Sequence, residues 1–142
     1  MYVLEEGVHF VKVLALQVPW AHSYADMRPG KTDRERRENY RLAASGKLQP
    51  IPSIVHWWAF RITVSKTGRP LDVDNIAKTI IDSFCAWQIT RDGSPYEHLG
   101  LYPDDTFDHV RVLQVIGNRC ATSDATRIEI FACIHDPDSA SP

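Results

Sequence analysis

Alternating apolar positions mark the β-strands of this chain. Residues 54–64 carry apolar side chains at both sets of alternating positions, a pattern typical of a central strand. Residues 127–134 alternate in the same way and predict a final strand. Two further strands are predicted from their β-branched and apolar content, at Val8–Val18, which Pro19 ends, and at Val110–Ile116.

Two segments have the spacing and end signals of helices. Thr32 and Glu35 fit the S/T-x-x-E capping box and Gly46 is a typical stop, so the first helix is predicted to run from Thr32 to Ser45. The second helix is predicted within Leu71–Trp87, after a turn. Its apolar residues recur at helical spacing and form one stripe, made up of Ile76, Ile80, Ile81 and Phe84.

The predicted elements follow one another in the order β-α-β-α-β-β. This order predicts an α/β fold in a single small domain, with a mixed β-sheet, helices packed on it and a C-terminal hairpin. Residues 91–103 contain two glycines and two prolines and are predicted to be a loop. The domain is expected to span residues 1–135, and residues 136–142 are expected to form a disordered polar tail.

The composition is that of an ordinary globular protein. Of the 142 residues, 44% are apolar and 24% are charged, which fits one domain. No apolar run approaches the roughly 20 residues that span a bilayer, and no leader peptide is expected. We therefore expect a soluble, cytoplasmic protein with no membrane partner. The three cysteines, Cys85, Cys120 and Cys133, form no CxxC pair; this argues against a disulfide scaffold or zinc site and predicts core positions.

Charge is distributed unevenly along the chain, although the net charge is only −2. From Arg28 to Lys47 there are seven basic and three acidic residues, a balance of +4. From Asp92 to Asp108 there are five acidic residues and no Lys or Arg, a balance of −5. These stretches are compatible with a phosphate-contacting surface beside a carboxylate metal site. A polar helix in the first stretch is equally typical of a solvated face, and both interpretations stay open.

Carboxylates cluster in two segments that are distant in the sequence. Asp74, Lys78 and Asp82 are spaced by four and therefore share one helix face, and Asp72 comes just before them. Asp104 and Asp105 form a second group ahead of the third strand. Converging carboxylates are the ligands that Mg²⁺ prefers, and a bound metal lowers the pKa of water and neutralises charge on a phosphate. The same acids are also explained as a helix cap, an exposed i,i+4 pair and a turn.

These residues resemble a known family of nucleases. Residues 72–82 read D-x-D-N-x-x-K-x-x-x-D, and Tyr102-Pro103-Asp104-Asp105 precedes a strand. Both features resemble the RusA-type Holliday junction resolvases, which are small, Mg²⁺-dependent, homodimeric endonucleases of DNA recombination and repair, frequent in phages and prophages. An N-terminal strand ending at Val18-Pro19 fits the same pattern. The segment between Asp82 and Asp104 is longer than in the family, so residues 91–101 are predicted to be an inserted loop.

The resemblance implies a role for each matching residue. Asp72, Asp74 and Asp105 would be catalytic metal ligands, and Lys78 would be the essential lysine. The supporting residues would be Asn75, Asp82 and Asp104, of which Asp104 is also an alternative ligand. The basic residues that we expect to contact DNA are Arg34, Arg36, Arg37 and Arg41 on the first helix, with Lys66 and Arg69 ahead of the motif.

The function implied by the resemblance is a Holliday junction resolvase. Such an enzyme cleaves four-way junctions or other branched DNA with Mg²⁺, or with Mn²⁺, which suits the same ligands. A homodimer would match the two-fold symmetry of a junction. The alternatives are a non-catalytic DNA- or protein-binding module of the same fold, and a structural protein whose acids only cap and turn.

Overall fold

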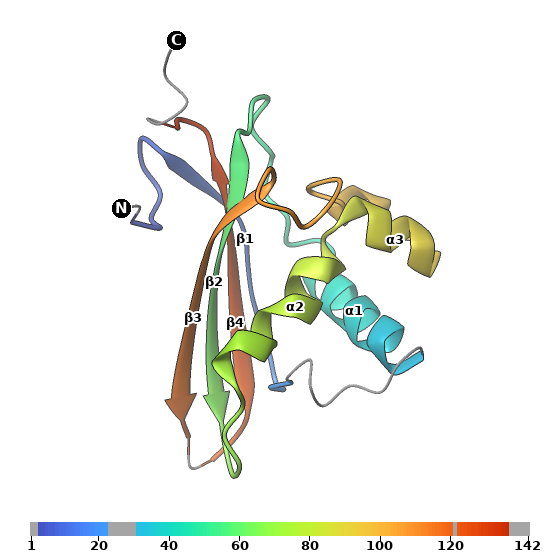
Figure 1. Cartoon of the computed structure of the whole chain (residues 1–142), viewed down its shortest axis with the longest axis vertical. Coiled ribbons are helices and arrows are strands. Elements are labelled where there is room, and N and C mark those ends of the chain that lie inside the picture. Colours follow the sequence, from blue (N-terminus) through green and yellow to red (C-terminus); the bar gives the residue numbers. More distant parts are fainter. Residues whose placement is uncertain (1–2, 23–30, 121, 137–142) are drawn as a thin grey trace.

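The computed structural model describes residues 3–22, 31–120 and 122–136, and within these it leaves the side chains of residues 31, 32 and 73–75 undescribed. The chain is a single-domain α/β protein with one mixed sheet. The strands are β1 (Phe10–Val18), β2 (Trp57–Lys66), β3 (Val110–Arg119) and β4 (Ala125–Cys133). Their order across the sheet is β1-β4-β2-β3 (Figure 1).

β2 lies inside the sheet, as its two-sided apolar pattern predicts. It pairs in parallel with β3 and antiparallel with β4. One face of β2 contributes Trp58, Phe60 and Ile62 to the main core beneath the helices. The opposite face contributes Trp57 to a smaller cluster that includes residues of the N-terminal segment. The prediction of a central strand is confirmed.

The predicted C-terminal hairpin is wrong. β3 and β4 follow each other in the chain, but β4 lies between β1 and β2 and pairs with both of them, whereas β3 pairs with β2. The physical reason is burial. Most residues of β4 are buried on both faces, which suits an interior position, while β3 has many exposed residues and forms an edge.

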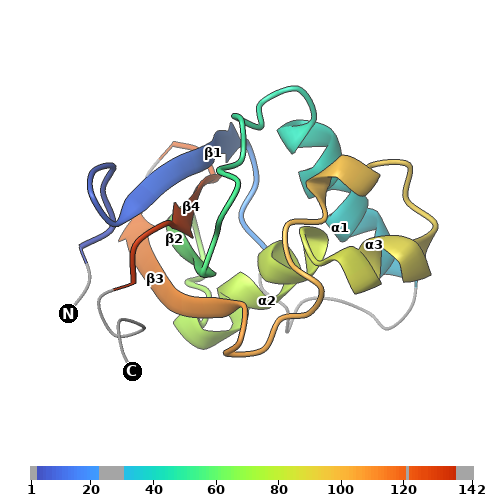
Figure 2. The same cartoon turned by 90° about the horizontal axis from the view of Figure 1, so that it is seen from above.

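The helices pack on one face of the sheet (Figure 2). They are α1 (Lys31–Ala44), α2 (Val73–Ser83) and α3 (Ala86–Asp92), with a short 3₁₀ helix at Glu97–Leu99. The predicted apolar stripe on α2 faces the core, because Ile76, Ile80 and Phe84 are buried and Ile81 is partly buried.

The interval after α2 is more ordered than the predicted loop. α3 extends to Asp92 and ends at Gly93, whose left-handed backbone (φ 66°) suits a glycine. Gly100 packs closely on Ala86, where a Cβ would come within 3.1 Å of the Ala86 Cα. Glycine and proline therefore mark helix ends and close contacts within residues 91–103. The seven-residue α3 is too short for its periodicity to stand out in the sequence.

Three smaller expectations have mixed outcomes. Cys85 and Cys133 are buried as predicted, but Cys120 is only partly buried. Asp136 is buried and accepts a hydrogen bond from Trp57 Nε1 at 2.9 Å, so the folded part includes this first residue of the predicted tail. Residues 137–142 lie outside the described part. Among the helices that the structure describes, none is both long and apolar enough to cross a membrane.

Candidate active site

The first residue of the motif, Asp72, immediately precedes α2. Asp72 is the N-cap residue, with an extended backbone (φ −73°, ψ 126°), and its exposed side chain makes no capping hydrogen bond. The backbone of Asp74 and Asn75 lies in the first turn of α2, and the side chains of these two candidate residues lie outside the described part. A role as helix cap therefore does not account for the Asp72 carboxylate, because that carboxylate makes no capping hydrogen bond.

Further along α2, the structure brings together a lysine and two carboxylates. The Lys78 Nζ lies 3.2 Å from the Asp82 Oδ2 and 4.0 Å from the Asp105 Oδ2. The side chains of Lys78 and Asp105 are 48% and 47% exposed, whereas that of Asp82 is only 7% exposed. We call these three residues the α2 charge group. It joins the two sequence segments that carry the family resemblance.

The electrostatics of the α2 charge group are not fully balanced. Burial raises the pKa of Asp82 above its usual value, and the charge and hydrogen bond of Lys78 offset only part of this effect. The negative charge of Asp105 raises the Asp82 pKa further. A cation placed near these carboxylates would be favoured by the same charges.

The segment that carries Asp105 is fixed against the junction of α2 and α3. Tyr102 is buried, forms a β-bridge with Cys85, and donates a hydrogen bond from its hydroxyl to the Ile81 carbonyl at 2.6 Å. The Ala86 N–H donates to the Tyr102 carbonyl at 2.8 Å. Burial raises the pKa of the Tyr102 hydroxyl well above its usual value, so this donor keeps its proton. Tyr102 was part of the sequence motif, but its anchoring role becomes visible only in the structure.

The two neighbouring acids of the second segment have different surroundings. Asp104 is turned to its own loop, where its Oδ1 accepts hydrogen bonds from the Thr106 hydroxyl at 2.7 Å and the Thr106 N–H at 3.1 Å. These hydrogen bonds lower the pKa of Asp104. Asp105 instead lies toward Lys78. The geometry favours Asp105 over Asp104 as the site residue.

A groove of about 410 Å³ borders Asp105. Its lining includes Ile81 of α2 and the apolar residues Phe107 and Val110. Phe107 is 86% exposed, which is unusual for so large an apolar side chain. Sequence reasoning missed this residue, because Phe107 is one of three aromatic residues in the acidic stretch and belongs to no motif.

Two of the four candidate arginines on α1 are not surface residues, and this corrects the expectation that they contact DNA. Arg37 donates two hydrogen bonds to Asp92, at 2.7 and 2.8 Å, and Arg41 donates one to Asp92 at 2.9 Å and one to Glu38 at 2.7 Å. Arg41 also donates to the Ser83 carbonyl at the end of α2, at 2.7 Å. We call Arg37, Glu38, Arg41 and Asp92 the α1–α3 charge cluster.

The remaining candidate DNA contacts stay near the surface. Arg34 and Arg69 are exposed, and Arg36 is partly exposed. The Lys66 Nζ lies 3.3 Å from the Asp124 Oδ2, and the same carboxylate accepts hydrogen bonds from Thr67 at 2.8 Å. Asp124, from the connection between β3 and β4, thus holds the turn that leads into α2.

The described side chains alone do not complete a metal centre. Within that part of the chain, no three His, Cys, Asp or Glu residues are grouped closely enough to hold an ion. The chemistry of the donors nevertheless suits Mg²⁺, because Asp72 and Asp105 are exposed carboxylates at the start and flank of α2. The side chain of Asp74, which lies between these two residues in the sequence, is outside the described part of the chain.

Comparison with known proteins adds no family assignment, because no protein-family model and no curated protein matches the chain. The similarity to the RusA-type resolvases therefore rests on residues 72–82 and 102–105.

Proposed function

We propose that this protein is a metal-dependent endodeoxyribonuclease of the RusA type that cleaves branched DNA. One observation carries the proposal: Lys78 of α2 lies between the carboxylates of Asp82 and Asp105, which come from the two separate halves of the motif. A purely local role as a cap or turn explains Asp104 but does not explain why Asp105 lies toward α2.

The proposed reaction is hydrolysis of a phosphodiester by water. Mg²⁺ or Mn²⁺, when bound by Asp72, Asp74 and Asp105, supplies an activated water and neutralises phosphate charge. Lys78 places an ammonium group beside the scissile phosphate, where it stabilises the negative charge of the transition state. Asp82 positions the Lys78 ammonium through their ion pair at 3.2 Å. Water adds at phosphorus, the P–O3′ bond breaks, and the departing O3′ takes up a proton. The products are a 3′-hydroxyl and a 5′-phosphate, the polarity that the resemblance implies.

The substrate and the assembly are part of the same proposal. A four-way junction has two-fold symmetry, and a homodimer would place one site on each of two strands. We also propose that the protein acts in the cytoplasm on DNA undergoing recombination or repair. The exposed arginines Arg34 and Arg69, with Arg36 and Lys66, provide salt-dependent contacts to the DNA backbone.

The test uses a labelled four-way junction and a linear duplex of matched sequence, each with Mg²⁺, Mn²⁺, Ca²⁺ or a chelator. We expect paired nicks in the junction with Mg²⁺ or Mn²⁺ and no cleavage with chelator. Asp105→Asn and Lys78→Met are each expected to reduce the cleavage rate by about 100-fold or more.

The adjacent acid supplies a matched control. Asp104→Asn removes a carboxylate one residue away that bonds Thr106, and it is expected to keep the rate within a few-fold of the parent protein. If Asp104→Asn abolishes cleavage and Asp105→Asn does not, the assignment of the site is wrong. If DNA is bound but never cut with any metal, the non-catalytic binding module replaces the nuclease.

A further inference from the structure

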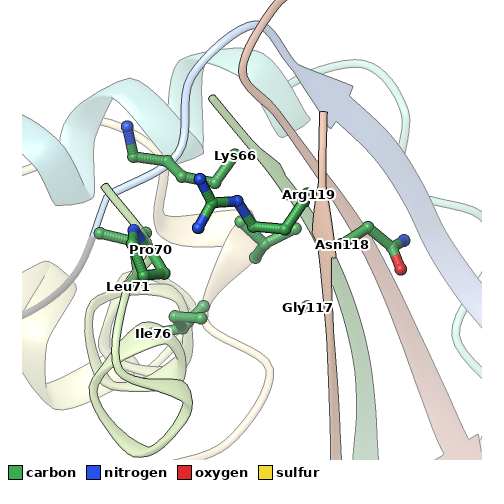
Figure 3. A pocket seen from close by; sticks show the side chains of 8 residues that line it. Lys66, Pro70, Leu71, Ile76, Gly117, Asn118 and Arg119 are labelled. Carbon is green, nitrogen blue, oxygen red and sulfur yellow. The ribbon is translucent and has the colours of Figure 1, made fainter. Parts of the chain in front are cut away.

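A cavity of about 210 Å³ opens beside the start of α2 (Figure 3). It lies where the parallel strands β2 and β3 end, between their last residues and the turn that leads into α2. In open α/β sheets, ligands bind in the crevice outside the carboxyl ends of parallel strands. Leu71 and Ile76, which line the cavity, immediately flank the Asp72–Asn75 segment. The cavity is therefore next to the candidate active site in the chain.

The lining has an apolar floor and a basic rim. Val64, Leu71 and Ile76 supply the apolar part of the lining, and Lys66 and Arg119 supply the cations. Figure 3 shows the Arg119 side chain reaching from the end of β3 toward Pro70 and Leu71. Residues Lys66 and Arg119 are paired in register across β2 and β3, which places both cations at the same end of the sheet. Sequence reasoning missed Arg119, because it ends a strand and belongs to no motif.

The charges at the rim leave a net attraction for an anion. Lys66 is paired with Asp124, whereas Arg119 donates a hydrogen bond to the Gly68 carbonyl, which carries no formal charge. The exposed Arg69 follows Gly68 in the same turn. An apolar floor with cations at the edge complements a nucleotide, whose base is apolar on its faces and whose phosphate is anionic.

We propose that this cavity receives one unstacked nucleotide of the DNA strand, next to the phosphate that is cut. The base lies on Val64, Leu71 and Ile76, and Arg119 contacts the adjoining phosphate. Pockets for drug-sized ligands measure about 300–1,000 Å³. The cavity, at about 210 Å³, is smaller than these pockets and suits a smaller group such as a single base. This inference rests on the proposed nuclease function and narrows its substrate to DNA that has an unpaired or easily unstacked nucleotide, since extracting such a base costs least.

The experiment measures binding in Ca²⁺ to two DNA molecules, a continuous duplex and the same duplex with one unpaired nucleotide. The parent protein is expected to bind the second at least about tenfold more tightly. Gly117 lines the cavity and has no positive φ, so Gly117→Leu fills the space from β3 without backbone strain. This variant is expected to lose the preference for the unpaired nucleotide while keeping its duplex affinity within about twofold.

Two arginine variants separate the pocket from general electrostatics. Arg119→Ala is expected to reduce the preference several-fold. Arg127→Ala is the matched control, because Arg127 is a half-exposed arginine beside Glu129, on the sheet face away from the helices. It is expected to leave the preference unchanged. If Gly117→Leu fails to fold, as judged by circular dichroism, Leu71→Phe fills the same cavity from the opposite wall.

The outcomes distinguish this inference from the nuclease proposal. Equal binding of both DNA molecules by the parent protein, or a preference that survives in a folded cavity-filling variant, overturns the pocket even if Mg²⁺-dependent cleavage occurs. A preference that the filling variant abolishes supports the pocket even if no metal produces cleavage, and in that case only the nuclease proposal fails.

Discussion

The α1–α3 charge cluster and the α2 charge group both pair aspartates with basic side chains, but they differ in how fully the charge of the aspartate is compensated. In the first, the Asp92 carboxylate accepts three hydrogen bonds from Arg37 and Arg41, and its side chain is 3% exposed. In the second, the buried Asp82 has the half-exposed Lys78 as its charged partner within 4 Å. One arrangement joins two helices, and the other leaves charge at the surface.

The pKa values of the two aspartates shift in opposite directions. Burial raises the pKa of Asp92, but the hydrogen bonds from Arg37 and Arg41 outweigh burial and leave the pKa below its usual value. Burial also raises the pKa of Asp82, and there Lys78 does not outweigh it. Charge that the fold leaves incompletely compensated at Asp82 therefore distinguishes the α2 charge group from the structural α1–α3 charge cluster.

The largest expected effect is the loss of Asp92. Asp92→Ala leaves two buried guanidinium groups without their shared carboxylate, and removing one partner of a buried pair typically costs about 3–5 kcal/mol. We expect the free energy of unfolding to fall by this amount in urea denaturation at pH 7. Asp108→Ala, at an exposed acid, is the control and is expected to change it by less than about 0.5 kcal/mol. A loss below about 1 kcal/mol for Asp92→Ala would show that the α1–α3 charge cluster does not hold the fold together and would contradict its structural role.

Glu129, on the other face of the sheet, is a second buried carboxylate whose charge is compensated by basic side chains. Hydrogen bonds from Arg61, together with Lys12, lower the pKa of Glu129 to about 2 against the effect of burial. Because the folded-state pKa is depressed, this stability is present above about pH 4.5 and is lost as the pH falls toward about 2. We expect Glu129→Gln to cost up to about 3 kcal/mol at pH 7 and almost nothing near pH 2. Unfolding curves across this pH range provide the measurement.

Asp82 is expected to respond with the opposite sign. Because its folded-state pKa is raised, the ionised form costs stability at neutral pH, and that cost disappears as the pH falls below the pKa of the unfolded chain. Asp82→Asn should therefore raise the free energy of unfolding at pH 7 by about 0.5–1 kcal/mol and reduce DNA cleavage. The difference from the parent protein should shrink at about pH 3. A destabilised Asp82→Asn would place Asp82 with Asp92 as a structural residue.

The sequence predicts the four strands and the first two helices because their apolar periodicity is strong, as in β2 and along the Ile76–Phe84 stripe of α2. It does not predict the pairing of β4 with β1 and β2, since pairing depends on burial against distant segments. Whether a charged side chain is buried also depends on distant segments. Arg34 and Arg37 are alike in the sequence, yet only Arg37 is buried, because Asp92 lies opposite it on the unpredicted helix α3. The motif could place Lys78 and Asp105 near each other, whereas distinguishing Asp105 from Asp104 required the Thr106 hydrogen bonds.

The smallest expected effect on stability belongs to Lys78, and it separates the two regions most sharply. Its ion pairs with Asp82 and Asp105 are made by a side chain that is 48% exposed, and surface pairs of this kind contribute about 0–1 kcal/mol. Lys78→Met keeps the length of the aliphatic chain and removes the ammonium, so the free energy of unfolding should change by less than about 1 kcal/mol. Under the nuclease proposal the same variant loses about 100-fold in cleavage rate. Asp92→Ala, assayed well below its urea midpoint, should show the reverse: a large loss of stability with a cleavage rate near that of the parent protein. If Lys78→Met is instead as destabilised as Asp92→Ala, the α2 charge group is a second structural cluster and its link to function is lost.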